Sequence, residues 1–332
     1  MSAFDALPHA EKLKRLERVA SNALAHYALP PGARVTMINL SENATYRVDA
    51  GERKWALRVH REAYHSRNAI ASELAWLIAL RRDGAVTTPV PVKGRDGEII
   101  QEVSAEGIDP RHVVLFEWEE GVEPSESDLL GPFEVLGEVT ARMHDHARAW
   151  RRPANFERLT WDFEGAFGDK GHWGSWRNGM GFDTAKTQLF ARGVDLIEKR
   201  LRKFGKGGER YGLIHCDMRL ANLLLDGPET KVIDFDDCGF SWYLYDCATA
   251  LSFIEHRPDV PALIDAWVRG YQKRGRLSGE EIAEIPTFVL FRRILLVAWI
   301  GSHAETDLAK SMGVQYTDDT LPLIENYLVK FG

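Results

Sequence analysis

One stretch of the sequence, Leu213 to Asp237, carries two clusters of residues that could do chemistry together. In chain order, the two clusters are His215, Asp217 and Asn222, then Asp234, Asp236 and Asp237. Between them lie two short apolar runs joined by the turn-forming sequence Asp-Gly-Pro-Glu-Thr, a pattern that predicts a β-hairpin. Because a hairpin returns its ends to one place, we expect the two clusters to meet at its open end.

These residue types suit the metal-assisted transfer of a phosphoryl group. Mg2+ prefers oxygen ligands, and Asp234 and the amide oxygen of Asn222 can supply them. Asp217 then remains to accept the proton of an attacking hydroxyl group. Arg219 could neutralise the charge that builds on the transferred group, because a guanidinium presents a fixed fork of donors. We expect His215 to brace the loop through hydrogen bonds rather than to transfer protons.

The order of these motifs resembles that of a known family. The motif H-x-D-x-x-x-x-N, the hairpin, the sequence I-D-F-D-D and the downstream pair Tyr245-Asp246 are similar to those of the aminoglycoside phosphotransferase and choline kinase-like family. Its most similar branch holds type II homoserine kinases and bacterial stress-response Ser/Thr kinases. The resemblance implies that Asp217 is the catalytic base and that Asn222 and Asp234 bind magnesium. It also implies that Asp246 is a buried carboxylate that braces the catalytic loop; the alternative is a hairpin with solvated acids and a satisfied histidine.

Composition sets the broad class of protein. The chain has 332 residues, of which 45% are hydrophobic, enough for one large two-lobed unit or two domains. A formal charge of −7 argues against a nucleic-acid partner, because no basic stripe is available to displace the counterions of phosphates. The three cysteines match no metal-binding spacing, so we interpret them as small buried hydrophobic residues in a reducing, cytoplasmic protein.

The sequence predicts no membrane segment. The N-terminus carries Asp5 and no long apolar region, so we expect no secretory signal. The most apolar stretch, Phe288 to Ile300, is interrupted by Arg292 and Arg293 and looks too short to span a bilayer.

Apolar periodicity predicts the elements that position these residues. In the first part of the chain we expect a helix over 11–27, strands over 34–40, 44–49 and 54–60, a helix capped by Ser66 or Asn68 that ends near Arg82, and strands over 97–102 and 112–116. Farther on we expect helices over 129–147, 184–204, 242–255, 260–274, 278–303 and 320–329. The family resemblance implies an α+β, protein-kinase-like fold: a small antiparallel-sheet lobe over 1–117, a hinge over 118–123 and a mostly helical lobe over 124–332.

The resemblance also implies nucleotide-binding residues in the first lobe. The turn that contains Ser41 and Asn43 takes the place of the nucleotide-covering loop, although it has no glycine. Its polar groups could donate to phosphates; the alternative is a plain hairpin turn. Arg58 stands where the family has a phosphate-binding lysine, and Glu73 is predicted to pair with it. The alternatives are a surface cation and an exposed glutamate.

The predicted hinge follows Phe116, which the resemblance places at the back of the nucleotide pocket. Backbone amide and carbonyl groups of Glu117 and Glu119 would then hydrogen-bond the adenine of ATP. ATP and Mg2+ are thus the expected co-substrate and cofactor.

The acceptor is predicted from charge. Asp236 and Asp237 follow the metal ligand, and Glu255, His256 and Asp259 lie downstream; these carboxylates favour a small hydroxylated acceptor that also carries an amine, such as an amino alcohol, homoserine or an amino sugar. Alternatively, Asp236 and Asp237 serve magnesium or a helix cap. Residues 150–182 are rich in aromatic residues and glycine, and they form either part of an acceptor pocket or lid, or an irregular insertion packed on the large lobe. Two other functions stay open: a Ser/Thr protein kinase, and a nucleotide-binding pseudokinase.

Overall fold

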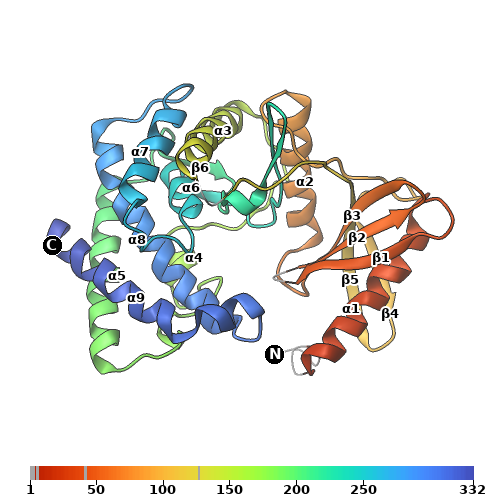
Figure 1. The fold of residues 1–332 in the computed structure, drawn as a ribbon, viewed down its shortest axis with the longest axis horizontal. Helices are drawn as coiled ribbons and strands as arrows, with labels where there is room; N and C mark the ends of the chain where they lie inside the picture. Colours follow the sequence, from red (N-terminus) through yellow and green to blue (C-terminus); the bar gives the residue numbers. More distant parts are fainter. Residues whose placement is uncertain (1–3, 5–6, 41–42, 126–127) are drawn as a thin grey trace. The chain divides into compact units, whose positions relative to one another are not determined.

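The structure is a computed structural model that describes residues 4, 7–40, 43–125 and 128–332. The chain forms two compact units. Unit 1 comprises Met1–Asp83, Thr87–Glu120 and Arg152–Glu157, and unit 2 comprises Gly84–Val86, Gly121–Arg151 and Arg158–Gly332. Unit 1 holds a small antiparallel sheet and unit 2 is mostly helical (Figure 1), as predicted for an α+β fold with one lobe of each kind.

Unit 1 is built on a five-stranded antiparallel sheet with the strand order β1-β2-β3-β5-β4. Its elements are α1 (His9–Ala23), η1 (Leu24–His26), β1 (Arg34–Leu40), β2 (Ala44–Ala50), β3 (Arg53–Val59), α2 (Arg67–Arg82), β4 (Gln101–Ala105) and β5 (Ile108–Glu117). Along β2 every second residue is buried, which is the alternation expected of a strand with one face on a core. The core joins that face to the buried side of α1, which supplies Val19 and Ala20.

Two local features of unit 1 explain where its elements begin. The Ser66 hydroxyl accepts a hydrogen bond from the Ala69 N–H, so α2 has the predicted N-terminal cap. Strand β4 begins at Gln101, later than predicted, because residues before it form a tight turn. In that turn Gly97 has φ +84°, and its N–H donates to the Gly94 carbonyl.

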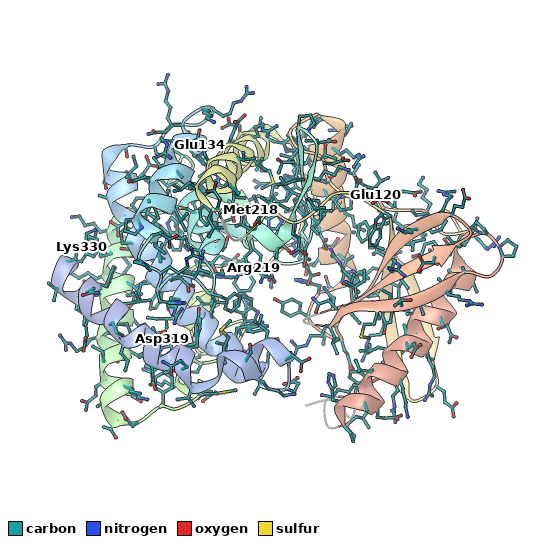
Figure 2. All side chains as sticks on the ribbon, viewed as in Figure 1. Glu120, Glu134, Met218, Arg219, Asp319 and Lys330 are labelled. Atoms are coloured by element: carbon teal, nitrogen blue, oxygen red, sulfur yellow. The ribbon has the colours of Figure 1, made fainter. Side chains whose placement is uncertain are left out.

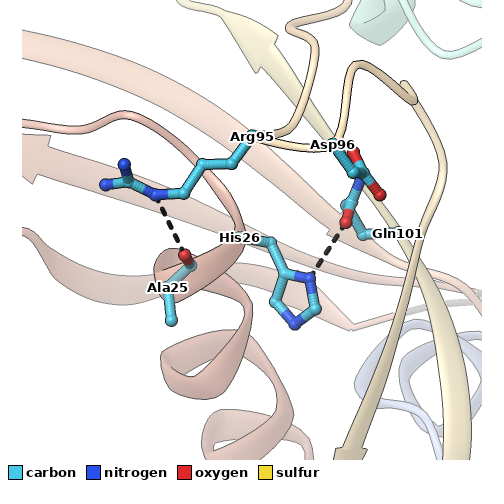
Figure 3. A pocket seen from close by; sticks show the side chains of 5 residues that line it. All are labelled: Ala25, His26, Arg95, Asp96 and Gln101. Atoms are coloured by element: carbon cyan, nitrogen blue, oxygen red, sulfur yellow. Dashed lines mark hydrogen bonds between the residues drawn. The ribbon is translucent and has the colours of Figure 1, made fainter.

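A shallow depression on unit 1 lies beside this turn (Figure 3). The imidazole Nδ1 of His26 lies 2.9 Å from Oε1 of Gln101, and Nε of Arg95 donates to the Ala25 carbonyl at 3.3 Å. These bonds attach β4 and the turn before it to η1.

Unit 2 carries the catalytic segment on a helical scaffold. Its elements are α3 (Leu130–Ala149), α4 (Phe163–Phe167), η2 (Trp176–Asn178), α5 (Thr184–Phe204), β6 (Tyr211–Ile214), η3 (Leu220–Asn222), β7 (Leu223–Asp226), β8 (Glu229–Val232), β9 (Gly239–Trp242), α6 (Tyr243–Ala250), α7 (Val260–Tyr271), α8 (Gly279–Ser302) and α9 (Asp307–Phe331). Helices α3 and α7 cross where Gly137 and Gly270 face the partner helix's backbone, and a Cβ at either position would overlap it. Glycine therefore sets how closely these helices pack.

The bounds of two predicted helices, α6 and α9, differ clearly from those observed. Helix α6 ends at Ala250, short of the predicted residue 255, and α9 begins at Asp307, well before the predicted residue 320. The start of α9 is fixed by Thr306, whose hydroxyl accepts from the Ala309 N–H. Helix α8 has 24 residues and a mean hydropathy of 1.5 over its most apolar window. We expected this stretch to be too short to span a bilayer, but the observed helix is long enough. That window is 78% buried inside the protein, which marks α8 as a core helix.

Candidate active site

The hairpin brings the two polar clusters together, as predicted. Leu223 at the start of β7 pairs with Val232 at the end of β8. One step beyond this pair, the Ile233 N–H donates to the Asn222 carbonyl at 2.9 Å. The residues before β7 and after β8 are therefore neighbours at the open end of the hairpin. Figure 2 labels Met218 and Arg219 on the first of these segments.

The carboxylate of Asp217 accepts hydrogen bonds from three side chains. Its Oδ2 lies 2.9 Å from Nδ2 of Asn222 and 3.1 Å from Nε of Arg219. Its Oδ1 lies 2.8 Å from Nη2 of Arg292, a residue of α8. Burial alone would raise the pKa of Asp217, but the two guanidinium groups outweigh it and hold this pKa below its usual value. Asp217 is thus an ionised carboxylate in a fixed orientation. Because its pKa is lowered, it is a weak base that depends on its position beside the proton donor.

A second carboxylate, Asp246 of α6, holds the backbone of the catalytic loop. Its Oδ2 accepts from the His215 N–H at 3.2 Å, and its Oδ1 accepts from the Cys216 N–H at 2.7 Å. The Asp246 side chain is fully buried, so its charge is balanced by these donors and by His144. Cys216 has φ +66°, a conformation that costs a non-glycine residue free energy and therefore needs such support.

His215 connects the two clusters. Its Nδ1 lies 3.3 Å from the Asp217 nitrogen, and its Nε2 lies 3.2 Å from the Ile233 oxygen. Since Nδ1 faces an N–H donor and Nε2 faces a carbonyl, the neutral imidazole carries its proton on Nε2. Both ring nitrogens are engaged with the backbone, in keeping with the bracing role we expected for His215.

The donor set at the hairpin suits a hard cation. Both hydrogen bonds of the Asn222 side chain use Nδ2, to the carbonyl and to Oδ2 of Asp217, which leaves the amide oxygen as a ligand atom. Asp234 lies on the segment after β8, with φ +59°. The pKa of Arg219 is raised mainly by Asp217, and the negative charge of Asp234 adds to this effect. One amide oxygen and one carboxylate at the hairpin mouth are the ligands that Mg2+ uses.

In unit 1 the predicted ion pair is present. Nη1 of Arg58 on β3 lies 2.6 Å from Oε1 of Glu73 on α2, and the glutamate side chain is fully buried. The Arg58 guanidinium also lies 5.3 Å from the ring centroid of Phe116. These contacts confirm the salt bridge and exclude both alternatives, a surface cation and an exposed glutamate.

At the other predicted nucleotide-binding positions, some hydrogen-bonding groups already have partners within the protein. Ser41 lies outside the described residues. The Asn43 side-chain oxygen accepts from the Arg61 N–H at 3.0 Å. The Glu117 N–H already donates to the Val90 carbonyl at 2.8 Å, so only the carbonyl of Glu117 stays a candidate for adenine. The Glu119 carboxylate pairs with Arg81 of α2 at 2.6 Å.

On the expected acceptor side, two of the predicted acids are already neutralised. Glu255 lies 2.8 Å from Nη1 of Arg293, with both side chains fully buried, and Asp259 pairs with Arg257 at 2.7 Å. Each of these charges thus has a partner within the protein, and the contribution of Glu255 and Asp259 to binding an amine stays a prediction.

Asp236 and Asp237 are held through their backbones. The Asp236 carbonyl accepts from Nη2 of Arg158, and the Asp237 carbonyl accepts from Nε1 of Trp161 at 2.8 Å. Burial lowers the pKa of Arg292, but nearby groups raise it above its usual value. Tyr245 and Asp217 make the larger contributions, and the negative charge of Asp237 adds a smaller one. Asp237 thus lies in the charged surroundings of the Asp217 carboxylate.

The aromatic segment divides into two parts. Trp176 is buried against Phe182 and Phe190, at ring-centroid distances of 5.7 and 5.5 Å, and so belongs to the core of unit 2. Trp173 instead lies 5.2 Å from the guanidinium of Arg292. Residues 158–182 therefore belong to unit 2 and reach the candidate catalytic loop through Trp173, whereas Arg152–Glu157 belong to unit 1.

Arg292 is the site residue that sequence reasoning missed. We noted it only as an interruption of an apolar stretch. A charged residue inside a long apolar helix must find a buried partner, and this was the available signal.

Comparisons with known proteins point to one family. The phosphotransferase enzyme family matches residues 38–282. An amicoumacin kinase of Bacillus subtilis (strain 168) is 25% identical over 300 residues, covering 86% of this chain and 85% of its own.

Two solved structures are similar over nearly their whole length. A microcompartment-associated aminopropanol kinase is 45% identical, with a TM-score of 0.88, and the match covers 95% of this chain and 98% of that one. An amicoumacin kinase, solved in complex with AMP-PNP, Ca2+ and Ami, has a TM-score of 0.77 at 20% identity, covering 95% of this chain and 96% of that one.

Proposed function

Because the chain belongs to the phosphotransferase enzyme family, we propose that it moves the γ-phosphoryl group of ATP to a hydroxyl group of a small, amine-bearing molecule. The acceptor class comprises amino alcohols, hydroxy amino acids such as homoserine, and amino sugars. One relative of the chain at 45% identity is an aminopropanol kinase, which favours an amino alcohol. The observation that carries the proposal is the Asp217 carboxylate, fixed beside Asn222 at 2.9 Å in the mouth of the hairpin.

In this mechanism Asp217 orients the acceptor's hydroxyl group and receives its proton as the new P–O bond forms. Because both carboxylate oxygens are hydrogen-bonded and the pKa is lowered, Asp217 acts by position more than by basicity. Arg219, which reaches Asp217 through Nε, neutralises charge on the transferred group. Asn222 and Asp234 would hold Mg2+, which neutralises the phosphate oxygens when it is bound.

We assign the nucleotide-binding role in unit 1 to Arg58. The ion pair with Glu73 fixes the direction of its guanidinium, whose planar fork of N–H donors suits bidentate contact with phosphate oxygens. Phe116, the Glu117 carbonyl and the backbone of Glu119 are assigned to the adenine. Asn43 is assigned to the phosphates through its side-chain NH2.

A protein acceptor is disfavoured by the chain after Asp234. Only a short loop separates Asp234 from β9, which begins at Gly239, and α6 follows at Tyr243. This leaves no long segment of the kind that orders a peptide in protein kinases. The three cysteines are buried thiols that form no disulfide with one another, in keeping with our proposal that the protein is cytoplasmic.

The test is ADP release by the full chain with ATP and MgCl2 against a panel of amino alcohols, hydroxy amino acids, amino sugars and an unstructured Ser/Thr peptide. We expect turnover with a member of the first three classes that depends on Asp217. Turnover with the peptide alone would favour the protein kinase. Binding of ATP without turnover of any acceptor would favour the pseudokinase.

A further inference from the structure

We infer that Arg292 of α8 is a positioning residue that fixes the Asp217 carboxylate in the orientation needed for proton acceptance. This inference rests on the proposed function. It adds a residue from a helix that lies outside the catalytic segment and that carries none of the predicted site residues.

The Arg292 guanidinium is held by three hydrogen-bond partners. Nη2 donates to Oδ1 of Asp217 at 2.8 Å, Nε donates to the Ser252 hydroxyl at 3.0 Å, and Nη1 donates to the Tyr245 hydroxyl at 3.2 Å. The aromatic rings of Trp173 and Tyr245 lie 5.2 and 5.8 Å from it. Only 3% of the side chain is exposed, so the guanidinium cannot turn away from Asp217 without leaving buried donors unsatisfied.

The two arginines that contact Asp217 therefore differ in freedom. Arg219 belongs to the same loop as Asp217, and its side chain is 31% exposed. It can leave the carboxylate for the phosphoryl group without breaking a buried network. Arg292 comes from 75 residues away and is enclosed, so it stays while Arg219 moves.

The two fixed contacts determine the plane of the carboxylate. Arg292 holds Oδ1 and the Asn222 amide holds Oδ2, so rotation about the Cβ–Cγ bond would break both. Oδ1 accepts one hydrogen bond and so keeps a lone pair for the acceptor's hydroxyl group, and Oδ2 gains one when Arg219 leaves it. A lysine at position 292 would keep the charge, but a single ammonium cannot serve three partners in the fork geometry of arginine.

The next residue of α8 provides a matched control. Arg293 is also fully buried and donates to Glu255 at 2.8 Å, to the Thr320 hydroxyl at 2.8 Å and to the Tyr316 carbonyl at 3.0 Å. It makes no contact with Asp217 among the interactions of the described residues. Replacing either arginine by lysine removes a buried fork from one helix, but only the change at 292 disturbs the carboxylate.

The experiment compares Arg292→Lys and Arg293→Lys in the full chain with the acceptor that the panel identifies. We expect Arg292→Lys to lower kcat at least about tenfold, because small misplacement of a reacting group is costly, with KM for ATP within about twofold. Arg293→Lys should lower Tm and leave kcat near the parent value. A folded Arg292→Lys variant with the parental kcat would overturn the inference.

Two further variants keep the result interpretable. If Arg292→Lys does not fold, Tyr245→Phe takes its place, because it removes one hydrogen-bond partner of the guanidinium with little change in shape. We expect Tyr245→Phe to lower kcat several-fold without changing KM for ATP. An unchanged kcat in the folded Tyr245→Phe variant overturns the inference. Asp217→Asn separates the two claims. If Asp217→Asn retains the parental kcat, the base assigned under the proposed function is wrong; if it loses activity while the Arg292 variants do not, only the positioning role fails.

Discussion

Nε2 of His144 lies 3.0 Å from Oδ2 of Asp246, and both side chains are fully buried although 102 residues separate them. Because the carboxylate can only accept, Nε2 carries the imidazole proton, and Nδ1 accepts from the Tyr271 hydroxyl at 3.0 Å. Asp246 in turn holds the His215 and Cys216 N–H groups. A chain of hydrogen bonds thus connects α7 and α3 to the catalytic loop.

We predict that His144 makes the stability of the protein pH-dependent. Burial lowers the pKa of His144, and the opposing effect of Asp246 does not restore it. In the unfolded chain this pKa is about 6.5, so below that pH the unfolded state binds a proton that the native state does not, and the free energy of unfolding falls as pH decreases. Denaturant unfolding between pH 5 and 8 should show a smaller loss for His144→Gln, which keeps a donor toward Asp246. Equal losses would remove His144 as the cause.

We expect Asp217→Asn to abolish most of the activity. The substitution keeps the size of the side chain but cannot accept a proton, and general bases contribute about 10²–10⁴-fold. ATP binding should change little. The control is Asp226→Asn on the same hairpin, where the half-exposed Asp226 carboxylate pairs with Lys231 at 3.0 Å. ADP release and nucleotide titration measure the two effects, and similar kcat values for both variants would contradict the assignment.

Asp234→Asn should raise the magnesium concentration needed for nucleotide binding. The amide keeps one oxygen but loses the charge that attracts a divalent ion. Titrating MgCl2 at fixed ATP and following nucleotide binding gives a readout that does not depend on turnover. A binding curve that matches the parent would exclude Asp234 as a ligand.

Glu73→Gln should weaken ATP binding in unit 1. The 2.6 Å pair with Arg58 is almost entirely enclosed, and leaving one buried charge uncompensated costs about 3–5 kcal/mol. Asp49→Asn breaks the Arg47–Asp49 bridge of the same sheet, which is exposed and worth at most about 1 kcal/mol. We expect a higher KM for ATP only in Glu73→Gln, with acceptor KM unchanged; the same KM in both variants would argue against the role of Arg58.

Glu255→Gln tests whether this acid serves the acceptor or the fold. Glu255 neutralises Arg293 in the interior, and the Tyr316 hydroxyl also donates to it at 3.3 Å. We expect a lower Tm and an unchanged KM for the amine-bearing acceptor. A rise in that KM without loss of Tm would return Glu255 to the acceptor site.

Local patterns in the sequence predicted the parts of this protein that depend on near neighbours. The turn between the apolar runs predicted the hairpin, and Ser66 predicted the start of α2. Residues spaced along the motif, such as Asp217 and Asn222, lie within five positions of each other, so the loop between them limits their separation. The Arg58–Glu73 pair came from resemblance to a family, because the residues lie on different elements.

Tertiary structure alone decided which long-range partners each charge has. Arg292 and Arg293 are adjacent and chemically identical, yet the turn of α8 directs one to Asp217 and the other to Glu255. No sequence period encodes this choice, since it depends on how α8 packs against α6 and α9. Burial then prevents either arginine from changing partners, because a charge enclosed in the protein must be paired where it lies. The sequence therefore specified the reacting groups, and packing determined which of them are held, neutralised or left free to act.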